Sequence, residues 1–282
     1  MADIDDVKLE KTAPPPPPPQ PRWIPILGII VLVIALGAVW YYFQQESDLD
    51  TAAGQRPAVP APGEGRIAEP QPVDLPPLDE SDAFVRDMVG QLSQHPVVMS
   101  LLATDGLIRT FAVSMMNIAD GDTPSRHLNT IKPERTFAVR KQRTQTVISP
   151  ESYARYDTHA AAISGLDAAG VAKAYNTLKP RIQEALREVR GSNADIDRTM
   201  ERAIVQLLSA PVVEGDVVVV QDIVGYSYAD PTLASLSRAQ QQLVRMGPEN
   251  TRRVQQKLRE VAAQLGIDPS SLPPERVIGA SR

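Results

Sequence analysis

WIPILGIIVLVIALGAVWYYF, residues 23–43, is a run of 21 residues without a charged side chain. A helix rises about 1.5 Å per residue, so the run spans roughly 31 Å, close to the hydrocarbon thickness of a bilayer. The apolar part of a signal peptide is shorter, about 7–15 residues. Cleavage after Ala38 would also need a small residue where Leu36 stands. Aromatic side chains lie at both ends, as in interfacial belts: Trp23, Trp40, Tyr41 and Tyr42. We expect a retained transmembrane helix that contacts the lipid bilayer.

The flanks of this run predict its orientation. Three basic residues precede it: Lys8, Lys11 and Arg22. The twenty residues after it contain a single basic residue, Arg56, and three acidic ones. Lys and Arg are retained on the cytoplasmic side of a membrane. Residues 1–22 should therefore be a cytoplasmic tail, and the chain after residue 43 should be exported.

Proline-rich segments lie on both sides of the run. Residues 1–22 contain six consecutive prolines, which favour a polyproline II rod. We interpret this rod as a stiff spacer; a ligand for a proline-binding module is the alternative. Residues 44–78 are rich in proline and poor in large apolar residues, which is typical of a disordered linker. We expect this linker to hold a domain away from the membrane surface.

Residues 79–266 have the pattern of one mainly helical domain, and residues 267–282 are expected to be a flexible C-terminal tail. Apolar residues recur at helical spacing from residue 79 onward and over residues 97–103, 105–119, 150–163, 167–190, 194–208, 231–246 and 248–265. Gly121 and Gly266 stand where two of these helices should end. Pro180 predicts that the helix over residues 167–190 restarts there.

Two stretches have the composition of strands. Residues 136–149 carry β-branched and aromatic residues at either end, and PVVEGDVVVVQDIVGYSY (residues 211–228) is rich in valine. In the second stretch, Glu214, Gly215 and Asp216 predict a turn between two extended arms. The expected fold class is therefore mainly α with a small antiparallel β element.

Composition excludes several classes of function. The chain has no cysteine, which excludes disulfides, thiol nucleophiles and cysteine-ligated zinc. Its net charge is −5 and its pI is about 5.3, which argues against nucleic acid as a partner. The sequence contains no G-x-S-x-G, no S-x-x-K and no glycine-rich phosphate loop. We expect no cofactor.

Three phrases carry a family resemblance: LPPLDESDAFVRDMV, LIRTFAVSMMNIADGDTPSRHLNTIKPERTFAV and GYSYADPTLASLSRAQQQLVRMGPENTRRVQQKLREVA. They resemble a proteobacterial family of uncharacterised single-pass envelope proteins, the domain of unknown function numbered 3014. The resemblance covers roughly residues 70–266 and the layout of anchor and linker. It implies a bacterial inner-membrane protein with a periplasmic domain, and it implies no activity or catalytic residue.

The loop DGDTPSRH (residues 120–127) is the strongest candidate for acid–base chemistry. Asp120, Asp122 and His127 could form a cluster if the loop folds back on itself. It fails as a calcium loop, because Pro124 occupies the third ligand position. Aspartate and glycine are also ordinary turn residues. His95, His127 and His159 show no short metal-ligand spacing, so we expect no metal site.

A basic segment breaks the acidic balance of the chain. Residues 126–143 contain one acidic residue, Glu134, and six basic ones: Arg126, Lys132, Arg135, Arg140, Lys141 and Arg143. Such a segment could dock on an anionic envelope partner or an acidic protein surface. It could equally be the solvated outer face of a hairpin.

Two classes of function remain as the main hypotheses, and a third is a further alternative. The leading hypothesis is an envelope protein whose helical domain serves as a scaffold or adaptor. The alternative is a periplasmic hydrolase or cell-wall-modifying enzyme that uses Asp120 or Asp122 with His127. A sensor of a small ligand would need an apolar pocket between helices.

Overall fold

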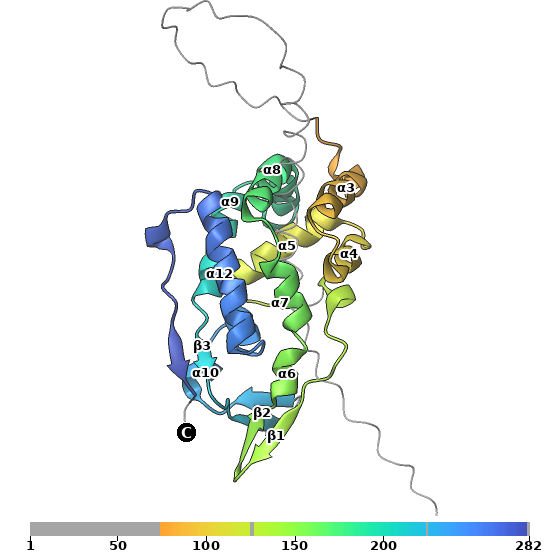
Figure 1. The fold of residues 1–282 in the computed structure, drawn as a ribbon. Coiled ribbons are helices and arrows are strands. Elements are labelled where there is room, and N and C mark those ends of the chain that lie inside the picture. The colour runs from red at the N-terminus through yellow and green to blue at the C-terminus, as the bar shows by residue number, and fades with distance from the viewer. Residues whose placement is uncertain (1–73, 125–126, 224, 281–282) are drawn as a thin grey trace, which may run out of the picture.

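Helices make up most of the chain that the structure describes, which is residues 74–124, 127–223 and 225–280 (Figure 1). The structure is a computed structural model. In chain order the elements are η1 (Leu78–Glu80), α3 (Asp82–Leu92), α4 (Pro96–Leu102), α5 (Leu107–Ala119), η3 (Asn129–Ile131), β1 (Val139–Gln142), β2 (Gln145–Ile148), α6 (Pro150–Ala154), α7 (Asp157–Ser164), α8 (Ala168–Arg190), α9 (Ile196–Leu208), β3 (Val212–Glu214), β4 (Val219–Asp222), β5 (Gly225–Tyr228), α10 (Pro231–Ala234), α11 (Arg238–Val244), α12 (Pro248–Gln264), η4 (Pro269–Ser271) and β6 (Val277–Gly279). The expectation of a mainly helical domain is confirmed.

The expected transmembrane helix at residues 23–43 lies outside the described residues, as do the tail before it and most of the linker. Within the described part, no single helix has both the length and the apolar composition to cross a membrane. Helices α4 and α5 reach that length and composition only as a pair, and they meet at a bend of 110°.

Helix α5 lies at the centre of the helical layers. Its buried side chains recur at helical spacing, so one broad face of the helix is apolar. That face packs against α8 and α9, while α12 packs against α7 and α8. Chain reversal after α5 occurs at Gly121, which has a φ of +81°. The expected end of this helix is confirmed.

Pro180 does not restart α8, contrary to the expectation from sequence. The helix runs unbroken from Ala168 to Arg190 with the proline inside it. Leu178 before the proline and Ile182 after it are both buried in the core. A proline in a helix interior costs about 3 kcal/mol, whereas burying one large apolar side chain contributes roughly 1.5–3 kcal/mol. Burial on both sides of Pro180 therefore outweighs the lost hydrogen bond.

The helix expected over residues 231–246 is divided into α10 and α11. Ser237 starts α11 with a capping box, in which its hydroxyl accepts from the backbone N–H of Gln240 at 3.2 Å. The Gln240 side chain accepts in return from the backbone N–H of Ser237 at 3.1 Å. In a continuous helix these two backbone N–H groups would donate to carbonyl oxygens of the preceding turn. Here two side chains accept from them instead, so a new helix can begin at Ser237.

Two antiparallel hairpins form the small β element that the sequence predicts. β1 pairs with β2, so that Val139 lies opposite Ile148, and β4 pairs with β5. An isolated bridge between Val147 and Val218 links the two hairpins. Ile148, Val219 and Tyr228 of these hairpins belong to a second, smaller core beside the helical one.

The turn expected at Glu214, Gly215 and Asp216 does not join two paired strands. β3, which precedes it, pairs in parallel with β6, and Val212 lies opposite Val277. β4, which follows it, pairs with β5 instead. The local sequence could not reveal this, because the partner of β3 lies near the C-terminus.

The chain after residue 266 belongs to the domain and is not the flexible tail that the sequence suggests. Leu272 packs against the helical core, and β6 extends the sheet that β3 begins. Arg252 of α12 forms ion pairs with Glu214 of β3 and with Glu275, just before β6. The domain therefore extends to residue 280.

The domain also begins earlier than expected. Leu78, which the predicted linker included, is buried. Arg181 of α8 donates hydrogen bonds to the carbonyl oxygens of Leu75 at 2.9 Å and Pro76 at 2.8 Å. We call residues 74–78 the leading segment. Its backbone is bound to α8 rather than solvated as a linker would be.

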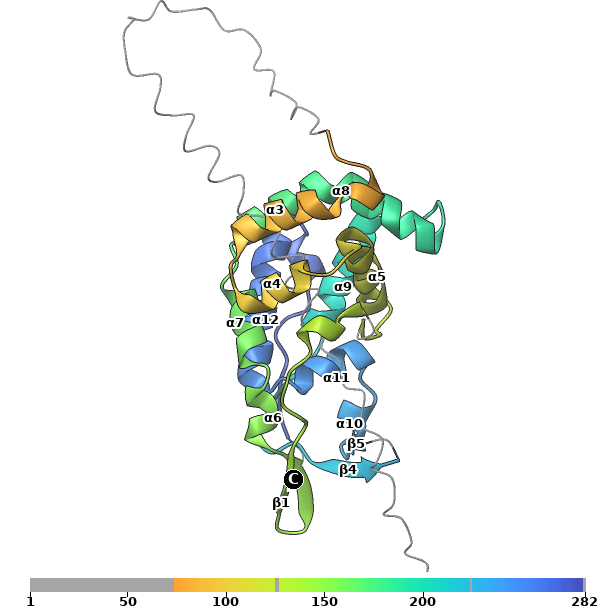
Figure 2. The same ribbon diagram turned by 90° about the vertical axis from the view of Figure 1, so that its right-hand side faces the viewer.

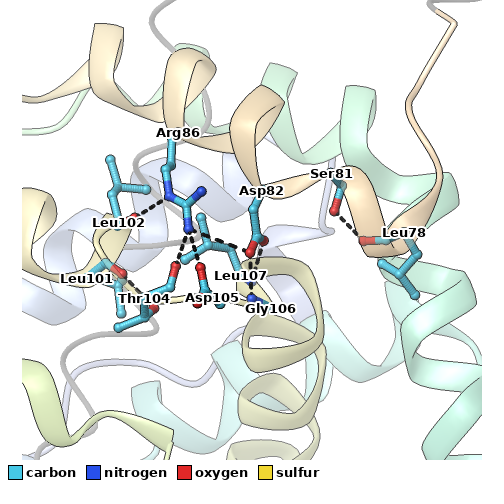
Figure 3. A network of polar contacts seen from close by, with 10 residues as sticks. All are labelled: Leu78, Ser81, Asp82, Arg86, Leu101, Leu102, Thr104, Asp105, Gly106 and Leu107. Atoms are coloured by element: carbon cyan, nitrogen blue, oxygen red, sulfur yellow. Dashed lines mark hydrogen bonds and ion pairs between the residues drawn. The ribbon is translucent and has the colours of Figure 1, made fainter.

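Asp82 and Arg86 of α3 connect α4 to α5 (Figure 3). The Asp82 carboxylate accepts hydrogen bonds from the backbone N–H groups of Gly106 at 2.7 Å and Leu107 at 2.8 Å. It thus caps α5, whose N-cap residue is a glycine without a side chain. Arg86 donates to the carbonyl oxygen of Leu102 at the end of α4 at 2.8 Å. One turn of α3 therefore fixes both neighbours.

The leading segment and the two hairpins lie at opposite ends of the domain. In both views α3 and α8 lie at one end with the leading segment, and β1, β4 and β5 lie at the other (Figure 1 and Figure 2). We call the β1–β2 and β4–β5 hairpins together the hairpin end. This arrangement places the hairpin end far from the point where the N-terminal part of the chain joins the domain.

Candidate functional site

The β1–β2 hairpin carries three of the six basic residues that the sequence predicts to bind a partner. Val147 and Ile148 are both buried, so the hairpin packs against the domain at the end of β2. Arg140, Lys141 and Arg143 are exposed. Arg143 lies in the turn with a φ of +54°, in the left-handed region. The hairpin therefore presents three cationic side chains to solvent.

One of these three charges is already paired. Arg140 donates to the carboxylate of Asp216 at 2.6 Å, and about 44% and 43% of the two side chains are exposed. A pair this exposed contributes at most about 1 kcal/mol to stability, because water screens it. Lys141 and Arg143 form no ion pair with another described residue. The charge that a partner would meet comes from these two residues.

The other predicted basic residues lie before the hairpin. Lys132 and Arg135 are exposed on the segment between η3 and β1. The carbonyl oxygen of Arg135 accepts a long hydrogen bond, 3.5 Å, from Arg155. Arg126 lies outside the described residues. The predicted set thus divides into a pair on the segment that leads to β1 and a group on the hairpin.

Asp120, part of the alternative acid–base cluster, is engaged by two arginines. It pairs with Arg190 at the end of α8 and with Arg202 of α9, the latter at 3.0 Å. Arg202 also donates to the carbonyl oxygen of Ala119 at 3.0 Å. These contacts join the ends of α5, α8 and α9, so Asp120 has a clear structural role.

Asp122 and His127 are not brought together by the loop. Asp122 lies 3.6 Å from Arg238 at the start of α11. His127 is exposed, and its backbone N–H donates to the carbonyl oxygen of Pro124 at 2.9 Å. Among the residues that the structure describes, no hydrogen bond joins His127 to either aspartate. The acid–base role of these residues therefore stays a prediction without geometric support.

In the part of the chain with described positions, no group of three or more His, Asp or Glu side chains could hold a metal ion. His95 accepts a hydrogen bond from the backbone N–H of Val97 at 3.3 Å and so caps α4. His159 binds the carbonyl oxygen of Ile131 at 2.7 Å. Both side chains have structural contacts.

A second group of residues was missed by sequence reasoning. Arg155 lies over two aromatic rings, those of Phe137 at 5.4 Å and Tyr156 at 4.8 Å. Arg245 lies over the ring of Tyr228 at 5.2 Å. The only local signal is the alternation of aromatic and basic residues in SYARY (residues 152–156). The other partners come from distant parts of the chain, so their proximity could not be predicted.

Comparison with known proteins gives one match. The family model described as a protein of unknown function (DUF3014) matches residues 107–262, from the start of α5 to near the end of α12. No curated protein and no solved structure matches the chain. The matched region is more than half of the 282 residues and contains both hairpins. The chain belongs to the DUF3014 family.

Proposed function

We propose that this protein is a single-pass protein of the bacterial inner membrane that presents an interaction domain to the periplasm. Residues 1–22 would lie in the cytoplasm, residues 23–43 would be the membrane anchor, and the domain would act as a scaffold or adaptor. The observation that carries the proposal is the position of the exposed cations Lys141 and Arg143 at the hairpin end, opposite the leading segment.

The position of the leading segment supports an outward-facing hairpin end. The domain is bound to its tether at α8, where Arg181 contacts the backbone of residues 75 and 76. A chain pulled toward the membrane from this end would orient the opposite end outward. A linker over residues 44–73 would reach on the order of 30 Å as a flexible coil and roughly 90 Å as polyproline II. The domain could thus search for a partner well above the bilayer.

The chemistry of the hairpin end favours an anionic partner. Lys141 and Arg143 carry charges that no described carboxylate neutralises, and Arg140 is held beside them by Asp216. Attraction by exposed charges weakens as salt shortens the screening length, from about 10 Å at 0.1 M to about 3 Å at 1 M. An acidic protein surface is the partner we infer, because a short hairpin offers a small, shaped contact rather than a broad basic face.

Photo-crosslinking in cells tests this proposal. A photoreactive amino acid placed at Gln142, which is exposed beside the turn, should capture a partner protein. The same amino acid at Val189 on α8, which is 53% exposed, is the control at the other end of the domain. We expect a discrete adduct from position 142 and none of that mass from position 189. Equal adducts from both positions, or none from position 142, would contradict the proposal.

A further inference from the structure

Two arginines and several aromatic rings meet between α6, α11 and the two hairpins. The ring of Phe137 lies 5.8 Å from that of Tyr226, and Arg155 lies over Phe137. The Tyr156 hydroxyl accepts hydrogen bonds from Arg155 at 3.2 Å and from Gln242 of α11 at 2.8 Å. We call the following residues the arginine–aromatic cluster: Phe137, Arg155, Tyr156, Tyr226, Tyr228 and Arg245.

The contacts of Arg155 are all neutral. Its guanidinium donates to the carbonyl oxygens of Ser152 at 2.9 Å and Arg135 at 3.5 Å, and to the Tyr156 hydroxyl. Its remaining contacts are the faces of two rings. Burial lowers the pKa of Arg155, because the charged form loses water without gaining a counter-ion. A cation placed in this way is costly unless an anion accompanies it.

Arg245 is the second arginine of the cluster. Burial lowers the pKa of Arg245, and the positive charge of Arg155 nearby lowers it further. Tyr228 and Tyr156 act in the opposite direction and raise this pKa. The positive charge of Arg155 thus disfavours the charged form of Arg245 in a half-buried environment.

Other arginines of the domain show what a structural arginine looks like here. Arg140 and Arg253 are exposed, and each pairs with a carboxylate, Asp216 and Glu249 respectively. Arg155 is less exposed than either. Arg181, which is less exposed than Arg140 and Arg253, also pairs with a carboxylate, that of Glu184. The half-buried Arg155, whose described partners are all neutral, differs from these three paired arginines.

We propose that the arginine–aromatic cluster binds a small organic oxyanion, a molecule that carries a carboxylate or phosphate group. A guanidinium has five N–H donors, and the three hydrogen bonds of Arg155 leave two for a bidentate contact with an oxyanion. Arg245 supplies the second positive charge, and the half-buried rings of Phe137 and Tyr226 supply an apolar wall. The proposal does not depend on the docking function of the hairpin end.

Calorimetric titration of the full chain tests the site with two probes, inorganic phosphate and acetate, against chloride at equal ionic strength. We expect saturable binding of at least one probe, and the comparison of the two identifies the preferred oxyanion. Arg155→Gln should weaken binding at least tenfold. Arg155→Lys should also weaken it, because lysine keeps the charge but lacks the two parallel donors. Arg140→Gln on the hairpin is the matched control and should bind as the unaltered chain does.

Two results would overturn the proposal. One is the absence of saturable binding of both probes to the unaltered chain, and the other is unchanged affinity in the Arg155→Gln chain. Circular dichroism shows whether that variant folds. If it does not, Arg245→Gln replaces it under the same criteria, with at least a tenfold loss expected and unchanged affinity overturning the site. Loss of binding in the Arg140→Gln control would show charge attraction by the hairpin and not a built site.

Discussion

Asp82 caps a helix that begins far from it in sequence: its carboxylate accepts a hydrogen bond from the backbone N–H of Gly106 at 2.7 Å. Glycine at the N-cap has no side chain to satisfy the first donors of α5, so α3 supplies the missing acceptor. The same carboxylate also accepts from Leu107 at 2.8 Å. The central helix of the domain is thus fixed by a tertiary contact, and α3 is an integral part of the fold.

Replacing Asp82 by alanine should therefore destabilise the domain. Loss of a cap costs about 0.5–2 kcal/mol, and here two backbone donors lose their acceptor. We expect the free energy of unfolding of the full chain, measured with denaturant, to fall by about 1–2 kcal/mol. Asp87→Ala, on the exposed face of the same helix, is the control and should change it by less than about 0.5 kcal/mol. Similar losses in the two variants would show that Asp82 does not cap α5.

A pair of glycines separates backbone strain from crowding. Gly247, between α11 and α12, has a φ of +83°, and a Cβ there would lie 2.7 Å from the ring of Tyr153. Gly191, after α8, has a similar backbone conformation, with a φ of +85°, and open space around the corresponding position. Gly191→Ala should cost about 1–3 kcal/mol of unfolding free energy from backbone conformation alone. Gly247→Ala should cost a further 1–3 kcal/mol, roughly, because it also overpacks the site. Equal costs would mean that Tyr153 moves aside freely.

His159 predicts a loss of stability in acid. Burial lowers its pKa below 6.5, His95 nearby lowers it further, and the carbonyl oxygen of Ile131 raises it. Because that carbonyl only accepts, Nε2 carries the proton, and the buried Nδ1 has no hydrogen-bond partner among the described residues. The folded state therefore binds fewer protons than the unfolded state does, so the contribution of His159 is complete above pH 6.5 and is lost as pH falls through the folded pKa.

The comparison of two histidine variants isolates this effect. In His159→Gln the decline of unfolding free energy between pH 7 and pH 5 should be shallower than in the unaltered chain. His127→Gln, at an exposed position, should leave that decline unchanged. Parallel pH profiles for the unaltered chain and His159→Gln would show that other groups control acid stability.

The proposed orientation in the membrane is tested with fusions. A reporter that is active only outside the cytoplasm should be active when fused after Arg282 and inactive when fused before Met1. The physical reason is the excess of basic residues before residue 23. The reverse pattern of activity would place the domain in the cytoplasm and would rule out a periplasmic partner.

Sequence periodicity was sufficient to predict the bounds of the helices that bury a regular apolar face. Helices α5 and α9 begin and end close to where the pattern predicts, because their buried residues recur every three to four positions. It failed where tertiary contacts override a local signal. Pro180 is tolerated inside α8 by burial on both sides, and Ser237 starts a new helix where the apolar pattern continues.

In the candidate sites, too, some features follow from local sequence and others depend on tertiary contacts. The exposed charges of Lys141 and Arg143 could be predicted, because lysine and arginine without a partner are almost never fully buried. The pairing of Arg140 with Asp216 could not, since it depends on how the β1–β2 hairpin lies against the turn between β3 and β4. The arginine–aromatic cluster was out of reach for the same reason, because Arg155 and Arg245 meet only in the folded chain.

A two-residue variant of the hairpin separates docking from folding. Lys141→Glu reverses one charge, and Arg143→Asn removes another with a residue that suits the left-handed turn. Arg140 is left in place, because reversing it would set a glutamate against Asp216. Exposed charges contribute little to stability, so the variant should fold as the unaltered chain does.

The yield of the crosslinked adduct from position 142 in this variant tests the central claim most directly. The matched control has an equal change of charge away from the hairpin end, Arg198→Glu with Arg187→Gln, at exposed positions on α9 and α8. If the hairpin end docks on an anionic partner, the adduct should fall at least tenfold in the hairpin variant and stay unchanged in the control. An undiminished adduct in a folded hairpin variant would contradict the account.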